Sequence, residues 1–269
     1  MKKIVLITGI SSGFGKETSE LLAMAGHTVY GTVRRTIDYH GDVKILKMDL
    51  TDSASIKNAV SEVLKNEGRI DVLINNAGMH TGGPIETSPA EHIRLQMDTN
   101  FVGTVLLIKE VLPIMRKNGG GTIINFSSIG GLLGLPYQGI YSAAKFAIEG
   151  LSEALRIEVR KYNIKVVIIN PSDFRTNNSA NRRKFLAPTG ADDPYQKQYE
   201  RTLATIEKDE ARGWKPVIMA KKIVRIVESR NPKNRYAVGT FISKLAVTVK
   251  HILPGRLFSR FIGYFYNIY

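Results

Sequence analysis

The sequence of 269 residues has no cysteine, one tryptophan and five histidines. Without cysteine there is no disulfide, no thiolate zinc ligand and no cysteine nucleophile. The histidines show no metal-ligand spacing, and we predict no metal site. No stretch approaches the roughly 18–20 apolar residues of a membrane span. The apolar run that follows Lys3 ends at Thr8, too early for a signal-peptide core, so we expect a cytoplasmic protein.

The clearest motif is TGISSGFG at residues 8–15, which follows the aliphatic run Lys3–Ile7. That run is typical of a strand buried on both faces, and helical apolar spacing follows on residues 16–25. Glycines at such a turn let a pyrophosphate approach backbone N–H groups and the positive end of the helix. We therefore predict dinucleotide contacts at Thr8, Gly9, Ser11, Ser12, Gly13, Phe14 and Gly15.

The end of the second predicted strand, which covers residues 28–33, indicates which dinucleotide is bound. Dinucleotide folds that prefer NAD place an acid at this strand end, on the ribose 2′-hydroxyl. Here Val33 holds the position and Arg34 and Arg35 follow. A guanidinium can hold a 2′-phosphate through two charge-assisted hydrogen bonds, so we predict that the protein binds NADP(H). We expect Arg34 to be the main phosphate contact and Arg35 the second. The alternative is that Arg34 and Arg35 are solvated loop residues that contact no cofactor.

Strand and helix patterns alternate along the chain. Further strands are predicted at 43–48, 70–74, 121–128, 165–170 and 236–238, and helices at 54–66, 89–117, 141–162 and 219–229. This alternation predicts an α/β fold with a single doubly wound, Rossmann-type parallel sheet and helices on both faces. No linker divides residues 1–269, so we expect one domain, with a lid segment at about 172–214 and a basic extension at about 240–269.

Tyr141 and Lys145 lie four residues apart, on one face at the start of a predicted helix. A nearby ammonium favours the phenolate and brings the pKa of a tyrosine toward neutrality. Such a pair can move a proton to or from an alcohol oxygen. Ser128 ends a strand thirteen residues earlier, and Asn100 lies on the preceding helix.

Taken together, these motifs resemble the short-chain dehydrogenase/reductase family over residues 3–176. The resemblance adds NNAG at 75–78 and PSDFRT at 171–176, which departs from the family's P-G-x-V-x-T at Ser172 and Phe174. It implies a catalytic tetrad in which Tyr141 is the acid/base, Lys145 binds the nicotinamide ribose and lowers the tyrosine pKa, Ser128 binds the substrate oxygen and Asn100 holds a relay water. Cofactor contacts are also expected at Asp49, Leu50, Asn76, Ala77, Gly78, Asn100, Tyr141, Lys145, Pro171, Phe174 and Thr176.

The loop 130–137 between Ser128 and Tyr141 is apolar and offers no charge to a substrate. With the helix after it, this loop is similar to the hydroxysteroid and retinol dehydrogenase branch. We therefore expect NADP(H)-dependent interconversion of a secondary alcohol and a ketone on a bulky, steroid-like substrate. A 3-oxoacyl-thioester reductase and a non-catalytic NADP(H)-binding sensor are alternatives. Candidate pocket walls are Met79, His80, Leu133, Tyr195 and Trp214.

The carboxyl end carries most of the chain's net charge of +14. Residues 213–269 hold eleven Lys and Arg against one acid, Glu228, so they contribute +10. Four apolar residues there recur at helical spacing: Leu245, Val249, Ile252 and Leu253. This spacing favours a helix that packs on the core or at a subunit interface. The other interpretation is a helix that binds weakly to a membrane surface. We expect a homo-oligomer, a dimer or tetramer, and no nucleic-acid partner, because no recognition motif accompanies the charge.

Overall fold

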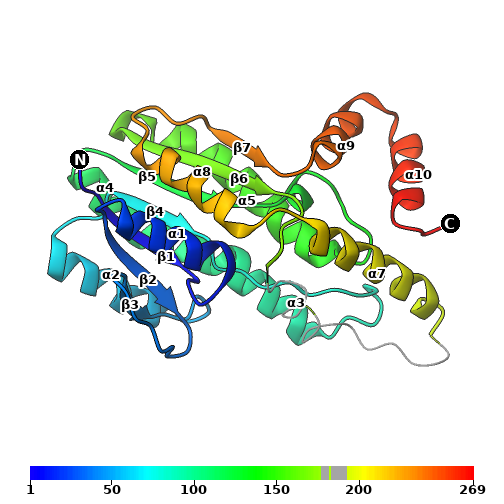
Figure 1. Cartoon of the computed structure of the whole chain (residues 1–269), viewed down its shortest axis with the longest axis horizontal. Helices are drawn as coiled ribbons and strands as arrows, with labels where there is room; N and C mark the ends of the chain where they lie inside the picture. The colour runs from blue at the N-terminus through cyan, green and yellow to red at the C-terminus, as the bar shows by residue number, and fades with distance from the viewer. Residues whose placement is uncertain (177–181, 183–192) are drawn as a thin grey trace.

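The computed structural model describes residues 1–176, residue 182 and residues 193–269. Its centre is a parallel seven-stranded sheet in the order β3-β2-β1-β4-β5-β6-β7 (Figure 1). The strands are β1 (Ile4–Thr8), β2 (Thr28–Val33), β3 (Lys44–Lys47), β4 (Val72–Asn75), β5 (Gly121–Phe126), β6 (Ile164–Pro171) and β7 (Arg235–Val238). The order reverses between β1 and β4, where doubly wound sheets bind ligands. The predicted fold class is confirmed; the single domain stays a prediction.

Successive residues of β1 point to opposite faces of the sheet, and both faces are covered. Leu6 packs into a cluster with α2 (Ser53–Glu67), α4 (Gly103–Lys117) and α5 (Gly139–Glu158). Val5 and Ile7 pack into a second cluster with α1 (Gly13–Met24) and α8 (Pro216–Glu228). All three side chains are fully buried, and each such burial contributes about 1.5–3 kcal/mol. The aliphatic run without alternation follows from this two-sided burial.

The long helix predicted at 89–117 is interrupted. It consists of α3 (Ala90–Met97), a π-helical turn (Asp98–Val102) and α4. The amide of Gly103 bonds to the carbonyl of Asp98, five residues back. Asn100 lies inside this turn, and π-turns of this kind occur mostly at functional sites.

The connection at 172–214, for which the sequence predicts a lid segment and no helix, contains α7 (Gln196–Arg212) in its second half. The helix buries Tyr199, Thr202 and Ile206, which have helical spacing. Because one member of that stripe is a threonine and the other faces are charged, the hydrophobic pattern is weak. Residues 177–181 and 183–192, also part of the predicted lid, lie outside the described residues.

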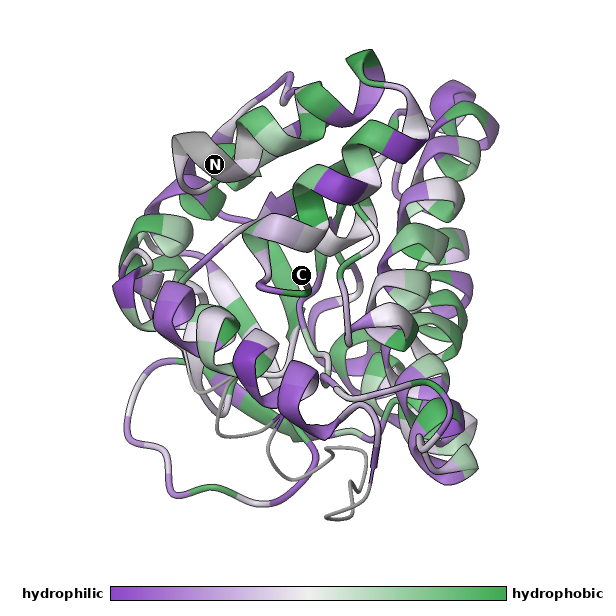
Figure 2. Cartoon of the chain, turned by 90° about the vertical axis from the view of Figure 1, so that its right-hand side faces the viewer, coloured by the Kyte–Doolittle hydropathy of each residue, from purple (hydrophilic) through white to green (hydrophobic). Residues whose placement is uncertain are grey.

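Two helices form the carboxyl end, α9 (Phe241–Ile252) and α10 (Gly255–Phe265). They stand at one end of the molecule beyond the sheet (Figure 1), and Figure 2, which faces this end, shows hydrophobic and hydrophilic residues interleaved around the C-terminus. The final residues return to α7, where Gln198 donates to the carbonyl of Ile268 (2.8 Å) and Thr202 to that of Tyr266 (3.0 Å). Among the described residues no helix is long and apolar enough to cross a membrane.

Candidate active site

The TGISSGFG turn joins β1 to α1 at the carboxyl edge of the sheet. Gly9 and Gly13 have φ angles of +73° and +59°, in the left-handed region that favours glycine. A Cβ on Gly9 would lie 2.8 Å from the Cα of Ala77, and one on Gly15 would lie 2.1 Å from the carbonyl oxygen of Gly9. Side chains here would break the turn that presents the N-terminus of α1.

A cavity of about 650 Å³, here called the site cavity, begins at this turn. Every predicted cofactor contact lines it except Thr8, Gly15 and Asn100. Ser128 lines the same cavity with Tyr141 and Lys145. A glycine cradle continuous with the Tyr–Lys pair fits an extended dinucleotide that places its reactive end at Tyr141. The described residues hold no cluster of three or more potential His, Cys, Asp or Glu metal ligands.

Thr8 and Gly15 support the cavity from behind instead of lining it. The Thr8 hydroxyl accepts hydrogen bonds from the backbone N–H groups of Asn76 (3.0 Å) and Ala77 (2.8 Å). The Asn76 side chain donates to the carbonyl oxygens of Thr8 (2.8 Å) and Gly9 (3.0 Å). These bonds fix the NNAG segment to the glycine turn, and Gly15 leaves the space that this packing needs.

Asn100 is 2% exposed and also lies outside the cavity lining. Its side-chain oxygen accepts from the backbone N–H of Met79 (2.8 Å), and its side-chain nitrogen donates to the carbonyl of Met79 (2.8 Å). The amide therefore holds the chain that follows NNAG. The relay water expected at Asn100 stays a prediction.

The structure brings Ser128, Tyr141 and Lys145 together. The Lys145 Nζ lies 5.8 Å from the centre of the Tyr141 ring and donates to the carbonyl of Phe126 (2.8 Å). The Ser128 hydroxyl forms a hydrogen bond with the Tyr141 phenol. The Ser127 hydroxyl is instead directed at the carbonyl of Lys145 (3.4 Å). This geometry favours Ser128 over Ser127 for the predicted serine role.

Burial dominates the protonation of the pair. It lowers the pKa of Lys145 to about 8, against an opposing effect of the Glu149 carboxylate. It also raises the pKa of Tyr141, and the Ser128 hydrogen bond opposes this only in part. The expected lowering of the tyrosine pKa by Lys145 and a nicotinamide cation stays a prediction, and desolvation opposes it because burial disfavours the phenolate. A protonated phenol is the form that can give a proton to a carbonyl oxygen.

His80 holds the Tyr141 ring from one side. The two rings stack with centroids 3.9 Å apart and planes 12° from parallel. Burial, and then the charges of Arg182 and Lys145, lower the pKa of His80 well below its usual value, so the imidazole is neutral. His80 thus fixes the orientation of the phenol without adding charge. It was predicted only as a pocket wall, and its sequence context gives no signal for this stacking.

Acidic side chains also line the site cavity, contrary to the apolar character expected from loop 130–137. Asp173, Asp209 and Glu210 face it. Glu210 is bound by the guanidinium of Arg182, which is 1% exposed, at 3.0 and 2.8 Å. Burial raises the pKa values of Asp173 and Asp209. Sequence reasoning missed Asp209 and Glu210 because they lie in a stretch of many charged residues, which usually indicates a solvated surface.

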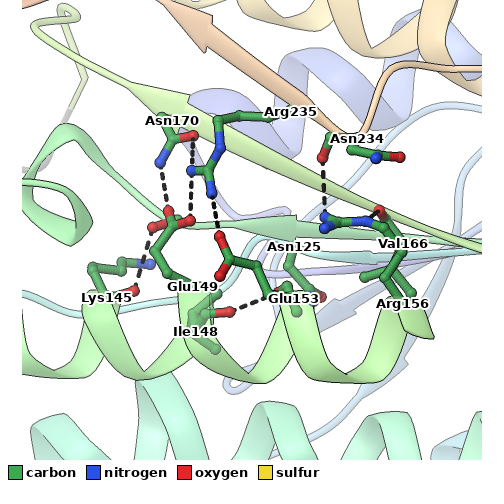
Figure 3. Close-up of polar contacts among 12 residues, drawn as sticks. Asn125, Lys145, Ile148, Glu149, Glu153, Arg156, Val166, Asn170, Asn234 and Arg235 are labelled. Atoms are coloured by element: carbon green, nitrogen blue, oxygen red, sulfur yellow. Dashed lines mark hydrogen bonds and ion pairs between the residues drawn. The ribbon is translucent and has the colours of Figure 1, made fainter. Parts of the chain in front are cut away.

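Glu149, Asn170 and Arg235 form a polar network between α5 and strands β6 and β7 (Figure 3). Asn170 donates to the carbonyl of Ser128 (3.0 Å) and to the carboxylate of Glu149 (2.6 Å). Arg235 donates to Glu149 (2.5 Å) and to Asn170 (3.0 Å). One turn after Lys145, Glu149 therefore ties the catalytic helix to β6 and β7.

The five predicted pocket walls lie in three places. Met79, His80 and Leu133 line the site cavity, and Tyr195 lines a neighbouring one. Trp214 lines neither, which corrects the prediction. It packs edge-on against Phe174 with ring centroids 6.2 Å apart, because a parallel bridge joins these two residues.

A family model described as short chain dehydrogenase matches residues 3–187, more than half of the chain. The chain belongs to the short-chain dehydrogenase/reductase family. This oxidoreductase is 46% identical over 266 residues to the 3-ketodihydrosphingosine reductase of Bacteroides thetaiotaomicron, a match that covers 99% of this chain and 98% of the relative.

Two solved short-chain dehydrogenase structures share the fold. One, from Burkholderia phymatum in complex with NAD, has a TM-score of 0.79 and covers 93% of each chain. The other, from Burkholderia cenocepacia in complex with NADP, has a TM-score of 0.75 and covers 96% of this chain and 97% of its own. Each is 23% identical and shows the fold alone. The choice of dinucleotide in this short-chain dehydrogenase must come from its own residues.

Proposed function

We propose that this short-chain dehydrogenase/reductase uses NADPH to reduce a ketone on a bulky apolar substrate to a secondary alcohol. The observation that carries the proposal is the shared cavity, in which a protonated Tyr141, Ser128 and Lys145 continue the glycine cradle. Open α/β sheets bind their ligands at this edge. Reduction of a ketone needs a proton donor, and the protonated phenol of Tyr141 can serve as one.

The chain's own residues supply the proton and the charge stabilisation. NADPH, when bound, supplies the hydride. Ser128 donates a hydrogen bond to the carbonyl oxygen, and Tyr141 gives that oxygen its proton. The Lys145 ammonium then stabilises the phenolate, which burial would otherwise disfavour. The family resemblance also assigns Lys145 to the nicotinamide ribose hydroxyls.

The end of β2 supports NADPH over NADH. Arg34 and Arg35 line the site cavity and are exposed, and neither forms an ion pair with a described residue. Val33 stands where an NAD-preferring fold has an acid. Two unpaired guanidinium groups suit a 2′-phosphate better than a 2′-hydroxyl.

Within bulky apolar ketones, the carboxylates of the site cavity favour one substrate class. The name of the Bacteroides relative gives 3-ketodihydrosphingosine, a long-chain ketone with an amine beside the carbonyl. Asp173 and Asp209 offer acceptors to an ammonium group, whereas a steroid ketone has no cation to place against them. We therefore propose a long-chain amino ketone as the substrate in preference to the steroid-like substrate expected from the sequence.

The test follows NADPH absorbance with 3-ketodihydrosphingosine, a steroid ketone, a 3-oxoacyl thioester and a small ketone. We expect the highest kcat/KM with the long-chain amino ketone. A higher value with the steroid or the thioester would assign the enzyme to that substrate class. NADPH binding without reduction of any member would favour the non-catalytic sensor.

Lys145→Met is expected to lower kcat at least tenfold and to weaken NADPH binding, since the lysine stabilises the phenolate and holds the cofactor. The pKa of Lys145 is about 8, so its charge is complete below that pH and is lost above it. The pH profile of kcat/KM in the wild type should therefore fall above about pH 8. Steady-state kinetics and fluorescence titration of NADPH measure both effects. A change in substrate KM alone would contradict the cofactor role.

The carboxyl-terminal helices expose an apolar surface flanked by positive charge. Of sixteen exposed large hydrophobic side chains among the described residues, seven lie between residues 245 and 269. Leu257 and Tyr264, 52% and 67% exposed, share one face of α10, and Arg256 and Arg260 border it. Residues 241–269 contain four Lys and Arg and no acid. We propose that this face rests on an anionic lipid surface, since each basic residue near such a surface contributes about 1 kcal/mol.

Sedimentation with vesicles tests this surface. We expect binding to phosphatidylglycerol-containing vesicles, little binding to phosphatidylcholine alone, and at least fivefold weaker binding for the Leu257→Ser/Tyr264→Ser variant. The control, Ile157→Ser/Ile218→Ser, removes exposed side chains elsewhere and should bind like the wild type. Equal sedimentation without anionic lipid would contradict the proposal. Light scattering gives the oligomeric state, and loss of a dimer or tetramer in the first variant would assign the face to a second copy.

A further inference from the structure

A second cavity of about 640 Å³ lies beside the site cavity. Its walls come from segments 83–86 and 134–139, the start of α7 and residues 258–269. The volume lies within the range of about 300–1,000 Å³ that is usual for small-ligand pockets. We refer to it as the side cavity. It is open to the surface and is built from parts of the chain that are distant in sequence.

The walls of the side cavity are fixed to one another by hydrogen bonds. The hydroxyl of Tyr137 donates to the side chain of Gln198, which in turn donates to the carbonyl of Ile268 (2.8 Å). The carbonyl of Tyr137 accepts from the backbone N–H of Gly83 (2.8 Å). Tyr137 has a φ of +57°, unusual for a residue other than glycine. The loop, α7 and the carboxyl end therefore form a built pocket.

The interior of the side cavity offers apolar surface and few polar groups. Pro84, Ile85, Leu135, Phe258 and Ile262 line it. The Glu86 carboxylate accepts a hydrogen bond from the Tyr195 hydroxyl (2.9 Å), and the Gln198 side chain is engaged as described above. A ligand there gains from apolar burial and not from specific polar contacts.

The two cavities meet at Leu135 and Ile262, which line both. The loop between them is a partition, since Tyr137 and Gly139 face the side cavity whereas Gln138 and Tyr141 face the site cavity. Leu135 and Ile262 therefore form the shared wall that a chain attached to a carbonyl at Tyr141 would have to pass to enter the side cavity.

We propose that the side cavity is the binding site for the alkyl chain of the substrate, entered between Leu135 and Ile262. The inference rests on the proposed function for the position of the carbonyl. It explains why a reductase with carboxylates beside its catalytic tyrosine has a separate apolar pocket. It also gives the inner face of α10 a role in selecting substrates by chain length.

The test measures binding separately from turnover. Straight-chain 3-ketones of six to eighteen carbons are titrated calorimetrically into the protein saturated with NADP⁺, where no reduction can occur. Burial of each methylene is expected to tighten binding by up to about fourfold until the side cavity is filled. Binding that does not depend on chain length would overturn the proposal.

The substitution Gly134→Leu fills the side cavity without touching the catalytic residues. Gly134 lines it, has no positive φ, and a Cβ there would meet no atom within 4 Å. We expect at least tenfold weaker binding of the long ketones and less than twofold change for the six-carbon ketone. Gly150→Leu is the matched control, because Gly150 is equally unobstructed and lines neither cavity. Ser259→Leu narrows the side cavity from α10 and should reproduce the effect.

The outcomes separate this inference from the proposed function. Length-dependent binding that Gly134→Leu abolishes supports the alkyl site even if NADPH reduces none of the ketones, a result that would overturn the proposed reduction alone. Reduction of the ketones with binding that Gly134→Leu and Ser259→Leu leave unchanged would overturn the alkyl site alone.

Discussion

Tyr141→Phe is expected to lower kcat for ketone reduction at least a hundredfold, while the affinity for NADPH changes less than twofold. Only the phenolic proton is removed, and a positioned general acid contributes about 10²–10⁴ in rate. The phenylalanine ring can keep its stacking on His80, whose centroid lies 3.9 Å from that of Tyr141. Single-turnover kinetics at saturating NADPH and fluorescence titration measure the two quantities.

Tyr162→Phe provides the control for this prediction. Tyr162 follows the same helix, lies outside both cavities and makes cation–π contacts with Arg116 and Lys161 through its ring, which phenylalanine retains. Its kcat should equal that of the wild type. Residual activity of Tyr141→Phe above a few per cent would exclude Tyr141 as the acid.

The double change Val33→Asp/Arg34→Leu is expected to invert the cofactor preference toward NADH. It removes a guanidinium from the predicted 2′-phosphate contact and adds a carboxylate that repels the phosphate. Each charge-assisted hydrogen bond that is lost should cost about 1.5–3 kcal/mol, and a tenfold change corresponds to about 1.4 kcal/mol. NADPH affinity should therefore fall at least tenfold while NADH improves. The measurement is kcat/KM with both dinucleotides at low ionic strength, where screening is least.

Arg35→Leu separates the contributions of the two arginines. If Arg34 is the main contact, this single change should reduce the preference for NADPH less than the double change does. An unchanged NADPH-to-NADH ratio in the double variant would place the phosphate elsewhere, with Arg35 or the Ser11–Ser12 turn as the next candidates.

The sheet and the glycine cradle were predictable from sequence because local rules determine them. β1 is buried on both faces, so its aliphatic run stands out, and the Asp52 side chain caps α2 by accepting from the backbone N–H of Ala54 (2.9 Å). Gly9 and Gly13 have positive φ angles, which favour glycine, and the TGISSGFG motif places a glycine at both positions. Tyr141 and Lys145 also lie close together as predicted, because residues four apart in an α-helix are neighbours on one face.

Features that depend on tertiary contacts were not predictable. The π-helical turn at Asn100 accompanies hydrogen bonds to Met79, twenty-one residues away. The stacking of His80 on Tyr141 joins residues that are distant in sequence, and burial at that contact raises the pKa of Tyr141. Glu210 reaches the site cavity on α7, a helix whose charged sequence reads as a solvated face. These contacts join segments that no local pattern relates.

Transfer of deuterium from NADPH is the most direct test of the central claim that the chain reduces a long-chain ketone. The protein is incubated with 3-ketodihydrosphingosine and NADPH carrying deuterium at both C4 positions, and the alcohol is analysed by mass spectrometry. We predict one deuterium on the carbinol carbon with the wild type and almost no labelled alcohol with Tyr141→Phe. The absence of alcohol with the wild type, or alcohol without deuterium at that carbon, would contradict the account.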